Sequence, residues 1–571
     1  MNNSELTIKI CGQAGQGTQT IGAVLGQVFK KAGYYLFANQ DYMSRVRGGN
    51  NFFQLRVAIN PIYTLRTQAQ IIVALDKESV ELHKAALSTG GVLIADGKKF
   101  SLSGDYPGFF DVPLFDLAQQ AGSEIFINTV ACGVILGITE TGFDYLEQVI
   151  RDIFKVKGEE VIGKNIQAAK SGYDFTGNNF KKDKFKLGDA RVQETLLLNG
   201  NEAIALGALK AGCKFYTAYP MSPSTTIMDT LAYYAKQFNL IVEQAEDEIA
   251  AVNMAIGASF AGARAMTASS GGGFALMVEG LSLAGMTETP VVIGCIQRPG
   301  PATGFPTRTE QGELDFLLSA GHGEFARAVY SPGTIEEAFY LTQKAFDLAE
   351  KYQIPVLIIS DQHLADSYRN IPPPDLEKVK TRRYILSKEE SKKVSNYKRY
   401  QLTESGISPR AIPSWIEDPV YLDSDEHTEE GHITEDAQLR VKMVEKRFYK
   451  KMAALATEIE APVVYNLEEA QVVLLGFGST YGALKEACRA KELKAGFVHF
   501  PQVWPFPSGK LLQILAGKKN IYTVENNAGG QLAKLIRRET GIQVDGSILR
   551  FDGRPFNLDY LTEQIKKRQN Q

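Results

Sequence analysis

Residues 6–17 read LTIKICGQAGQG, an alternating apolar strand that runs directly into a glycine-rich turn. In residues 20–29 apolar side chains recur at helical spacing, so we expect a helix after the turn. Further strand-like segments lie at residues 51–57, 70–74 and 92–94. Strands that alternate with helices are typical of a parallel α/β sheet, so residues 1–172 are predicted to form an α/β domain.

The same alternation recurs twice further along the chain. The strands that mark it are at residues 214–218, 291–296, 356–360 and 470–476. We therefore predict a multidomain α/β protein with domains at 1–172, 192–369 and 461–571. The polar, basic residues 173–191 predict a linker, and the charged, proline-dotted residues 370–460 predict a connecting segment.

Length, composition and charge exclude several classes of protein. The chain has 571 residues, of which 44% are hydrophobic and 22% are charged, unlike disordered, collagen-like or coiled-coil proteins. Its formal net charge of −3 gives no reason to expect nucleic acid or a membrane surface as a partner. No apolar run is long enough for a membrane helix and no secretory signal is visible, so we expect a cytoplasmic protein.

The cysteines and histidines are scattered along the chain. The five cysteines are Cys11, Cys132, Cys213, Cys295 and Cys488. No C-x-x-C or H-x-x-x-H pair is present, so neither a zinc site nor a four-cysteine iron–sulfur cluster can be assigned locally. We expect that this chain holds no metal of its own.

Three glycines, Gly12, Gly15 and Gly17, occupy the strand-to-helix turn where a phosphate loop would lie. A Walker loop needs a lysine that this turn lacks, and the dinucleotide fingerprint has a different glycine spacing. Backbone amides at the start of a helix could still bind an anion. A tight turn without a ligand explains the glycines as well.

Four acids, Glu243, Glu246, Asp247 and Glu248, precede a helix of small residues at 249–263. The helix dipole favours acids there, which explains most of them. Small residues let neighbouring elements approach closely, and an acid buried beside them could donate a proton. A functional carboxylate is therefore a hypothesis at this position.

Two loops follow predicted strands at the edge where open α/β sheets bind ligands. Residues 298–310 read RPGPATGFPTRTE, in which the guanidinium of Arg298 and nearby hydroxyls would suit a substrate carboxylate. A rigid surface loop with ion pairs is the alternative. In YPMSPS, residues 219–224, two prolines flank Ser222, which we expect to hydrogen-bond a ligand rather than act as a nucleophile.

These motifs in this order resemble the alpha subunit of 2-oxoacid:ferredoxin oxidoreductases. The resemblance rests on residues 219–224, on AEDEIAAVNMAIGA (245–258), QRPGPATGFPTRTEQ (297–311) and DSDEHTEEGH (423–432), and on ENNAGGQ (525–531) and DGRPF (552–556). Residues 12–17, with Arg47, Gly48 and Gly49, resemble the gamma-type domain, here fused ahead of the alpha part. The resemblance implies a gamma-type domain, a pyrimidine-type thiamine diphosphate domain and a transketolase C-terminal-like domain.

The chemistry that the resemblance implies is oxidative decarboxylation. A 2-oxoacid and coenzyme A give acyl-CoA and carbon dioxide, thiamine diphosphate supplies the carbanion, and ferredoxin accepts the electrons. The resemblance places Glu248 on the aminopyrimidine N1′ as the thiamine-activating residue, Arg298 on the substrate carboxylate and Thr307 in support. Ser222 replaces the usual threonine in binding the substrate.

The resemblance also assigns cofactor contacts and partners. Tyr219 and Pro220 would contact thiamine diphosphate, and Gly12, Gly15 and Gly17 would receive coenzyme A. The diphosphate, magnesium and a [4Fe–4S] cluster would belong to a separate beta subunit, since this chain lacks the matching motifs. We predict 2-oxoglutarate as the substrate, with pyruvate or a branched-chain 2-oxoacid as alternatives. A transketolase-like or dehydrogenase-type thiamine enzyme and a non-catalytic CoA- or nucleotide-binding scaffold are further alternatives.

Overall fold

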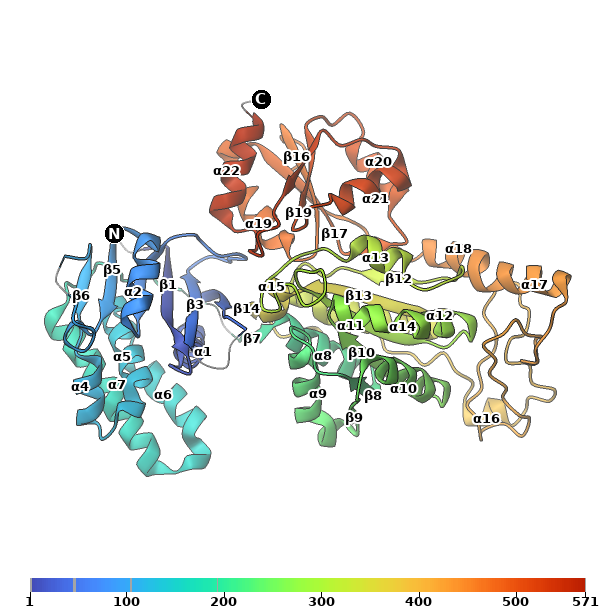
Figure 1. The fold of residues 1–571 in the computed structure, drawn as a ribbon, viewed down its shortest axis with the longest axis horizontal. Coiled ribbons are helices and arrows are strands. Elements are labelled where there is room, and N and C mark those ends of the chain that lie inside the picture. Colours follow the sequence, from blue (N-terminus) through green and yellow to red (C-terminus); the bar gives the residue numbers. More distant parts are fainter. Residues whose placement is uncertain (1–2, 45–47, 103–104, 191, 193, 570–571) are drawn as a thin grey trace. The chain divides into compact units, whose positions relative to one another are not determined.

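The computed structural model describes residues 3–44, 48–102, 105–190, 192 and 194–569, and the chain forms two compact units (Figure 1). The N-terminal unit comprises Met1–Leu198, Asp366–Pro373 and Asn557–Glu563, and the main unit comprises Asn199–Ala365, Pro374–Phe556 and Gln564–Gln571. Residues 192–198 and 366–369, expected in the second domain, thus belong to the first unit. The reason is that each contributes to a strand of the first sheet, β7 at its edge and β14 next to it.

The N-terminal unit is built on one eight-stranded sheet in the order β6-β5-β4-β1-β3-β2-β14-β7. Its strands are β1 (Glu5–Ala14), β2 (Tyr35–Asp41), β3 (Gly48–Ala58), β4 (Ala69–Ala74), β5 (Leu87–Ala95), β6 (Phe109–Asp111), β7 (Leu196–Asn199) and β14 (Tyr368–Ile371). β1, β4, β5 and β6 pair in parallel, whereas β3 pairs antiparallel with both β1 and β2. The prediction of a parallel sheet is therefore wrong for half of it, because β2 ends at Asp41 and β3 begins at Gly48, and this spacing is too short for the crossover that parallel pairing needs.

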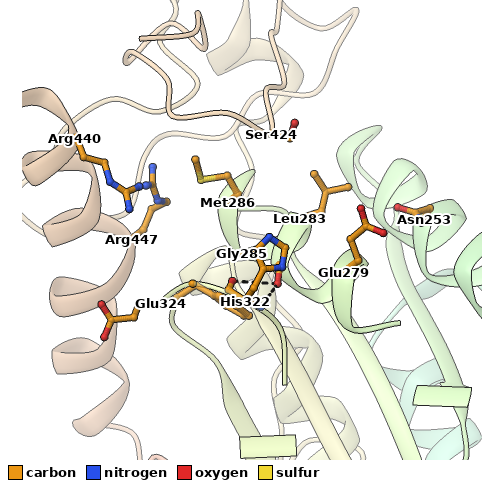
Figure 2. Close-up of a pocket in the computed structure, with 14 residues that line it drawn as sticks. Asn253, Glu279, Leu283, Gly285, Met286, His322, Glu324, Ser424, Arg440 and Arg447 are labelled. Carbon is orange, nitrogen blue, oxygen red and sulfur yellow. Dashed lines mark hydrogen bonds between the residues drawn. The ribbon is translucent and has the colours of Figure 1, made fainter. Parts of the chain in front are cut away.

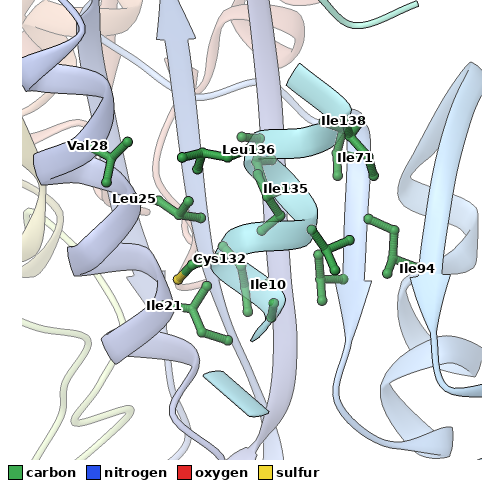
Figure 3. Close-up of a cluster of buried hydrophobic side chains, with 14 of the residues drawn as sticks. Ile10, Ile21, Leu25, Val28, Ile71, Ile94, Cys132, Ile135, Leu136 and Ile138 are labelled. Carbon is green, nitrogen blue, oxygen red and sulfur yellow. The ribbon is translucent and has the colours of Figure 1, made fainter. Parts of the chain in front are cut away.

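Helices cover this sheet, and their apolar faces form its core. They are α1 (Thr18–Lys31), α2 (Lys77–His83), α3 (Gly97–Phe100), α4 (Leu114–Gln120), α5 (Ile127–Thr139), α6 (Phe143–Phe154) and α7 (Glu159–Asn179). The first turns of α22 (Leu558–Gln569) belong to this unit and the rest of that helix to the main unit. Figure 3 shows Ile21 and Leu25 of α1 and Ile135 of α5 packed with Ile10 and Ile71 of the sheet. The periodicity that predicts α1 thus reflects a buried face.

Helix α7 extends into the residues predicted as a linker. It ends at Asn179, and its Thr176 is buried, as is Phe185 beyond its end. Gly133 of α5 and Gly172 of α7 let the two helices approach closely, because a Cβ at either would clash with a backbone oxygen of the other helix. The aromatic side chains of residues 173–185 therefore pack on the core, a contribution that a count of aliphatic residues misses.

The main unit contains a seven-stranded sheet in the order β18-β12-β13-β11-β10-β8-β9. Its strands are β8 (Cys213–Ala218), β9 (Ile241–Gln244), β10 (Arg264–Ser269), β11 (Val291–Gln297), β12 (Ala328–Tyr330), β13 (Pro355–Asp361) and β18 (Gln502–Trp504). Its helices are α8 (Gly200–Lys210), α9 (Thr225–Phe238), α10 (Glu248–Phe260), α11 (Gly271–Leu276), α12 (Val278–Met286), α13 (Leu314–Ser319), α14 (Ile335–Tyr352) and α15 (Gln362–Asp366). All its strands except β18 run parallel, so their carboxyl ends share one edge of the sheet.

A five-stranded sheet, ordered β15-β17-β16-β19-β20, completes the main unit. Its strands are β15 (Val463–Tyr465), β16 (Val472–Phe477), β17 (Ala495–Phe500), β19 (Ile521–Glu525) and β20 (Gly546–Leu549), and its helices are α19 (Thr480–Ala487), α20 (Ser508–Leu515) and α21 (Gln531–Thr540). One hydrophobic cluster contains Ile293 of β11 together with Leu475 of β16 and Phe500 of β17. The second and third predicted domains therefore share a core.

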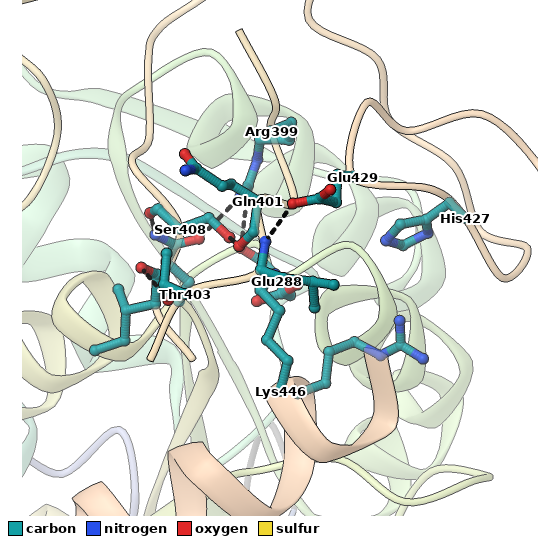
Figure 4. A network of polar contacts seen from close by, with 12 residues as sticks. Glu288, Arg399, Gln401, Thr403, Ser408, His427, Glu429 and Lys446 are labelled. Atoms are coloured by element: carbon teal, nitrogen blue, oxygen red, sulfur yellow. Dashed lines mark hydrogen bonds and ion pairs between the residues drawn. The ribbon is translucent and has the colours of Figure 1, made fainter. Parts of the chain in front are cut away.

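A buried ion cluster ties the connecting segment to the rest of the main unit (Figure 4). The segment contains α16 (Lys388–Ser391), α17 (Ala437–Val444), the π-helix Glu445–Lys450 and α18 (Lys451–Ala456). The fully buried carboxylate of Glu288 lies 2.5 Å from both Lys446 Nζ and Lys451 Nζ, and Arg399 Nη2 donates to its backbone oxygen at 2.6 Å. Burial alone would raise the pKa of Glu288, but the charges of these three cations outweigh it and hold the pKa below its usual range.

We expect Glu288→Gln to lower the free energy of unfolding by at least ~2 kcal/mol, because it leaves three buried cations without a counter-charge. Since the pKa of Glu288 is lowered, the stability that it contributes is present above the ordinary glutamate pKa and is lost as the pH falls through the lowered value. Denaturant unfolding at neutral pH measures the effect. The exposed Glu435→Gln serves as the matched control, and equal stability of the two variants would contradict the prediction.

Membrane and metal signals are weak in the described part of the chain. No single helix there has the length and apolar composition to cross a membrane. α4 and Glu124–Thr139 together have that length and composition, and the chain bends by 119° between them. No group of three or more His, Cys, Asp or Glu side chains among the described residues is arranged to hold a metal ion. All five cysteines are buried and free.

Candidate active site

The YPMSPS loop, residues 219–224, follows β8 at the carboxyl edge of the seven-stranded sheet. Two hydrogen bonds hold it: Ser224 Oγ donates to the oxygen of Met221 at 2.7 Å, and Asn201 Nδ2 donates to the oxygen of Pro223 at 2.7 Å. Tyr219 is exposed and Pro220 is half-buried. The loop therefore presents a fixed backbone at the edge where a ligand would bind.

Glu248 is the first residue of α10, and its side chain is only 3% exposed. The helix begins there because the side chain of Asp247 accepts a hydrogen bond from the backbone nitrogen of Ala250 at 2.7 Å. Ser269 Oγ, at the end of β10, lies 3.2 Å from Glu248 Oε1 and 3.5 Å from Met221 Sδ. Glu248 is thus held beside the YPMSPS loop.

Glycine at position 273 leaves room around the Glu248 carboxylate. Residues 269–273, SSGGG, contain the end of β10 and the first turn of α11. A Cβ at Gly273 would clash with both Glu248 Oε1 and Ser269 Oγ. Ser270 Oγ is buried here and makes no hydrogen bond within the described residues.

Arg298 follows β11 and reaches the same loop. Its Nη1 donates to the backbone oxygen of Ser222 at 2.7 Å, and partial burial lowers its pKa from the ordinary arginine value. Arg298 therefore contacts residues 219–224 directly, whereas Glu248, 50 positions earlier in the sequence, is linked to them through Ser269. Thr307 is buried further along the Arg298 loop, and its side chain makes no hydrogen bond to Arg298 within the described residues.

Two carboxyls that the sequence analysis did not select lie at the end of the Arg298 loop. Burial, reinforced by the charge of Glu310, raises the pKa of Glu313 to about 8. Burial also raises the pKa of Glu310. Their position in a strand-end loop with Arg298 was the signal that could have identified them.

The ENNAGGQ motif, residues 525–531, holds the Arg298 loop from the five-stranded sheet. The backbone nitrogen of Gln311 donates to the backbone oxygen of Asn526, and the backbone nitrogen of Asn526 donates to Gln311 Oε1. Asn527 Nδ2 donates to the oxygen of Gln311 at 3.2 Å, and Gln531 Nε2 donates to the oxygen of Gly312 at 2.7 Å. These contacts join residues more than 200 positions apart. They fix the C-terminal end of the loop that begins at Arg298. The motif therefore positions the site rather than reacting in it.

The glycines Gly12, Gly15 and Gly17 lie in the N-terminal unit, at the end of β1 and the start of α1. Gly15 and Gly17 have φ values of 92° and 82°, and Gln16 Oε1 accepts a hydrogen bond from the backbone nitrogen of Gln13 at 2.7 Å. The loop is therefore a tight turn that only glycine forms without strain. Arg47, which completes the gamma-type motif, lies outside the described residues.

The DSDEHTEEGH motif borders a separate cavity of about 580 Å³ (Figure 2). Glu426 accepts two hydrogen bonds from Arg447, both at 2.8 Å, and also pairs with Arg440. Burial opposes these contacts, yet they lower the pKa of Glu426 to about 2. Figure 2 shows both arginines on one side of the cavity and Glu279 on the other, and none of the predicted site residues lines it.

Three family models match the chain. The model described as pyruvate flavodoxin/ferredoxin oxidoreductase, thiamine diP-bdg matches residues 206–446, pyruvate ferredoxin/flavodoxin oxidoreductase matches residues 7–175, and pyruvate:ferredoxin oxidoreductase core domain II matches residues 470–560. The 2-oxoacid:ferredoxin oxidoreductase subunit alpha of Sulfolobus sp. is 34% identical over 98% of this chain and 96% of its own length. The chain belongs to the 2-oxoacid:ferredoxin oxidoreductase family, as an alpha-type subunit.

The names of two further relatives of this alpha-type subunit include 2-oxoglutarate. The 2-oxoglutarate synthase subunit KorA of Archaeoglobus fulgidus is 31% identical over 62% of this chain and 94% of its own length. The solved structure of 2-oxoglutarate:ferredoxin oxidoreductase from Magnetococcus marinus with 2-oxoglutarate, coenzyme A and succinyl-CoA bound has a TM-score of 0.92 and 30% identity, covering 99% of this chain and 100% of that chain. The family resemblance and the multidomain α/β fold are thereby confirmed, and the chain is an oxidoreductase subunit.

The residues around Glu248 fit thiamine diphosphate, the cofactor named in the description of the first model. Gly273 has no side chain to crowd the buried carboxylate, and the unpaired Ser270 Oγ offers a hydrogen-bonding group in the same turn. A buried carboxyl matches the needs of a protonatable ring nitrogen. The fit concerns the ring portion of the cofactor.

Proposed function

We propose that this chain forms the aminopyrimidine-facing wall of the active site in a CoA-acylating 2-oxoacid:ferredoxin oxidoreductase that converts 2-oxoglutarate to succinyl-CoA. The observation that carries the proposal is that Arg298 and Ser269, which hydrogen-bonds Glu248, both contact the same YPMSPS loop. An acid and a cation held beside one rigid loop are what proton exchange and carboxylate binding need. The relatives that act on or contain 2-oxoglutarate support that substrate.

Glu248 holds the proton-exchanging position in this proposal. Thiamine diphosphate, when bound, supplies the carbanion that attacks the 2-oxo carbon. Glu248 would hold a proton at the aminopyrimidine N1′, with Ser269 fixing its carboxylate at 3.2 Å. Tyr219 and Pro220 would contact the same ring system from the loop.

Arg298 orients the substrate. Its hydrogen bond to the oxygen of Ser222 uses Nη1, which leaves the rest of the planar guanidinium for a carboxylate. Ser222 would add a hydroxyl to the same substrate. Thr307 would contribute by shaping the loop, since its side chain lies buried within it.

The proposal assigns the remaining parts to partners. A beta subunit would hold the diphosphate, magnesium and a [4Fe–4S] cluster, and ferredoxin would receive the electrons. Support comes from the scattered cysteines, all of them buried, and from the alpha-subunit names of the full-length relatives. The location in the cytoplasm remains part of the proposal.

Co-expression with a candidate beta chain tests this function. The purified complex is assayed for viologen reduction with 2-oxoglutarate, pyruvate and branched-chain 2-oxoacids, each with coenzyme A. Fastest reduction with 2-oxoglutarate is the expected result. A preference for another 2-oxoacid would overturn the substrate, and no reduction with any would favour the non-catalytic scaffold.

The Gly12–Gly17 turn is proposed to receive coenzyme A. We expect Gly15→Ala to raise the KM for coenzyme A about five- to thirtyfold, the factor that corresponds to ~1–2 kcal/mol of left-handed backbone strain in alanine. A Cβ at Gly15 meets nothing within 4 Å, so the substitution changes backbone conformation without a clash. Steady-state kinetics measures the effect, with the KM for the 2-oxoacid unchanged.

Gly163→Ala is the matched control. Gly163 lies within α7 of the same unit, and a Cβ there also meets nothing within 4 Å. If both variants keep the wild-type KM for coenzyme A, the turn has no role in binding it.

A further inference from the structure

A second buried carboxyl flanks the candidate active site. Glu313 precedes α13, and its backbone nitrogen donates to Gln297 Oε1 at 3.0 Å. A Cβ at Gly271 would lie 2.5 Å from Glu313 Oε1, whereas a Cβ at Gly273 would meet Glu248. The two carboxyls therefore lie against the same first turn of α11.

Four ionisable groups surround Glu313. Glu310 and Arg298 belong to its own loop, Cys295 lies on β11, and Glu248 lies across the α11 turn. Burial raises the pKa of the Cys295 thiol well above its ordinary value, so it stays neutral. Burial and the charge of Glu310 raise the pKa of Glu313 to about 8, against the opposing charge of Arg298, which favours the neutral form of Glu313 at pH 7.

The neutral state of Glu313 matters because of Arg298. None of the ion pairs within the described residues includes Arg298, whose guanidinium donates to the oxygen of Ser222. Glu313 Oε2 is buried and makes no hydrogen bond within the described residues either. An ionised Glu313 would attract the guanidinium and repel an incoming carboxylate, whereas a neutral acid does neither.

We propose that Glu313 is a positioning residue that, as a neutral carboxylic acid, keeps the Arg298 guanidinium available to the carboxylate of the 2-oxoacid. The inference rests on the proposed function of Arg298. Ionisation of Glu313 then weakens binding of the 2-oxoacid without altering the residues that exchange protons with the cofactor. Glu313 acts through Arg298 and need not touch the substrate.

The pH dependence of KM tests the proposal in the complex with the beta subunit. With one ionisation near pH 8, the KM of the wild-type complex for 2-oxoglutarate is expected to rise about tenfold from pH 7 to pH 9. Glu313→Gln, which stays neutral, is expected to abolish the rise. A wild-type KM independent of pH, or an equal rise in Glu313→Gln, would overturn the proposal.

Glu310→Gln supplies the matched variant. Because the charge of Glu310 raises the pKa of Glu313, its removal is expected to move the rise in KM to lower pH while preserving its size. A rise at the wild-type pH in this variant would contradict the coupling between the two carboxyls.

Infrared difference spectra of the full chain separate this proposal from the proposed function, because they need no turnover. The carbonyl stretch of a neutral carboxyl, present in the wild type at pH 7 and lost by pH 9, is expected to be missing in Glu313→Gln. If the wild type lacks this carbonyl stretch at pH 7, Glu313 is not neutral and the proposal is wrong. A wild-type complex that shows this signal yet reduces no viologen with any 2-oxoacid would instead overturn the proposed function.

Discussion

Glu248→Gln is expected to lower kcat of the complex by about 10²–10⁴-fold, the range for loss of a positioned general acid or base. Glutamine preserves the shape of the side chain and its contact with Ser269, but it cannot exchange a proton at the aminopyrimidine N1′. Viologen reduction at saturating 2-oxoacid and coenzyme A measures the effect. Size-exclusion chromatography with the beta chain should show unchanged assembly, because the variant keeps the volume of a buried side chain.

The exposed Glu246 provides the control for this substitution. Glu246→Gln changes the same charge two positions earlier, outside the buried site, and is expected to keep kcat within about twofold, as for a surface substitution. A fully active Glu248→Gln complex would remove Glu248 from the mechanism. Equal losses in both variants would point to the net charge before α10 rather than to the buried carboxyl.

Arg298→Ala is expected to raise the KM for the 2-oxoacid at least about thirtyfold, because loss of one partner from a desolvated charge pair costs ~2–4 kcal/mol. The KM for coenzyme A should stay the same. Steady-state kinetics with each substrate varied in turn separates the two. The lost contact would bind the 2-oxoacid equally in the ground state and in the transition state. Therefore kcat at saturating 2-oxoacid should fall much less than kcat/KM.

Arg298→Lys tests whether the planar guanidinium is needed as well as its charge. Lysine keeps the charge but lacks the paired donors that match a carboxylate, so an intermediate KM is expected. An unaltered KM in Arg298→Ala would reject the carboxylate contact. If the KM for coenzyme A rose instead, Arg298 would belong to another binding site.

The strand-end loops were predictable because the local sequence determines them. Buried strands at residues 214–218 and 291–296 place the segments that follow at one edge of a parallel sheet, which is where the structure has Ser222 and Arg298. The acid-rich start of α10 could be predicted from its N-terminal preferences. The roles of these residues stay predictions, but their proximity is a property of the fold.

Other features depend on contacts between distant segments. Gln311 and Asn526 are 215 residues apart, and only the folded chain shows that Asn526 positions the loop that contains Gln311. Glu313 was missed because its properties come from burial beside Gly271 and from Glu310, not from any motif. The antiparallel β3 and the packed end of α7 were mispredicted because loop length and aromatic packing decided them, rather than the strand–helix alternation.

The central claim is that this chain supplies only one wall of a shared thiamine diphosphate site. Isothermal titration of thiamine diphosphate with Mg²⁺ into the purified chain, into the beta subunit and into their complex tests it most directly. The account predicts tight binding and 2-oxoacid-dependent viologen reduction for the complex, and no turnover with only weak binding for this chain alone. Tight binding of the whole cofactor and oxidation of 2-oxoacids by this chain by itself would contradict it.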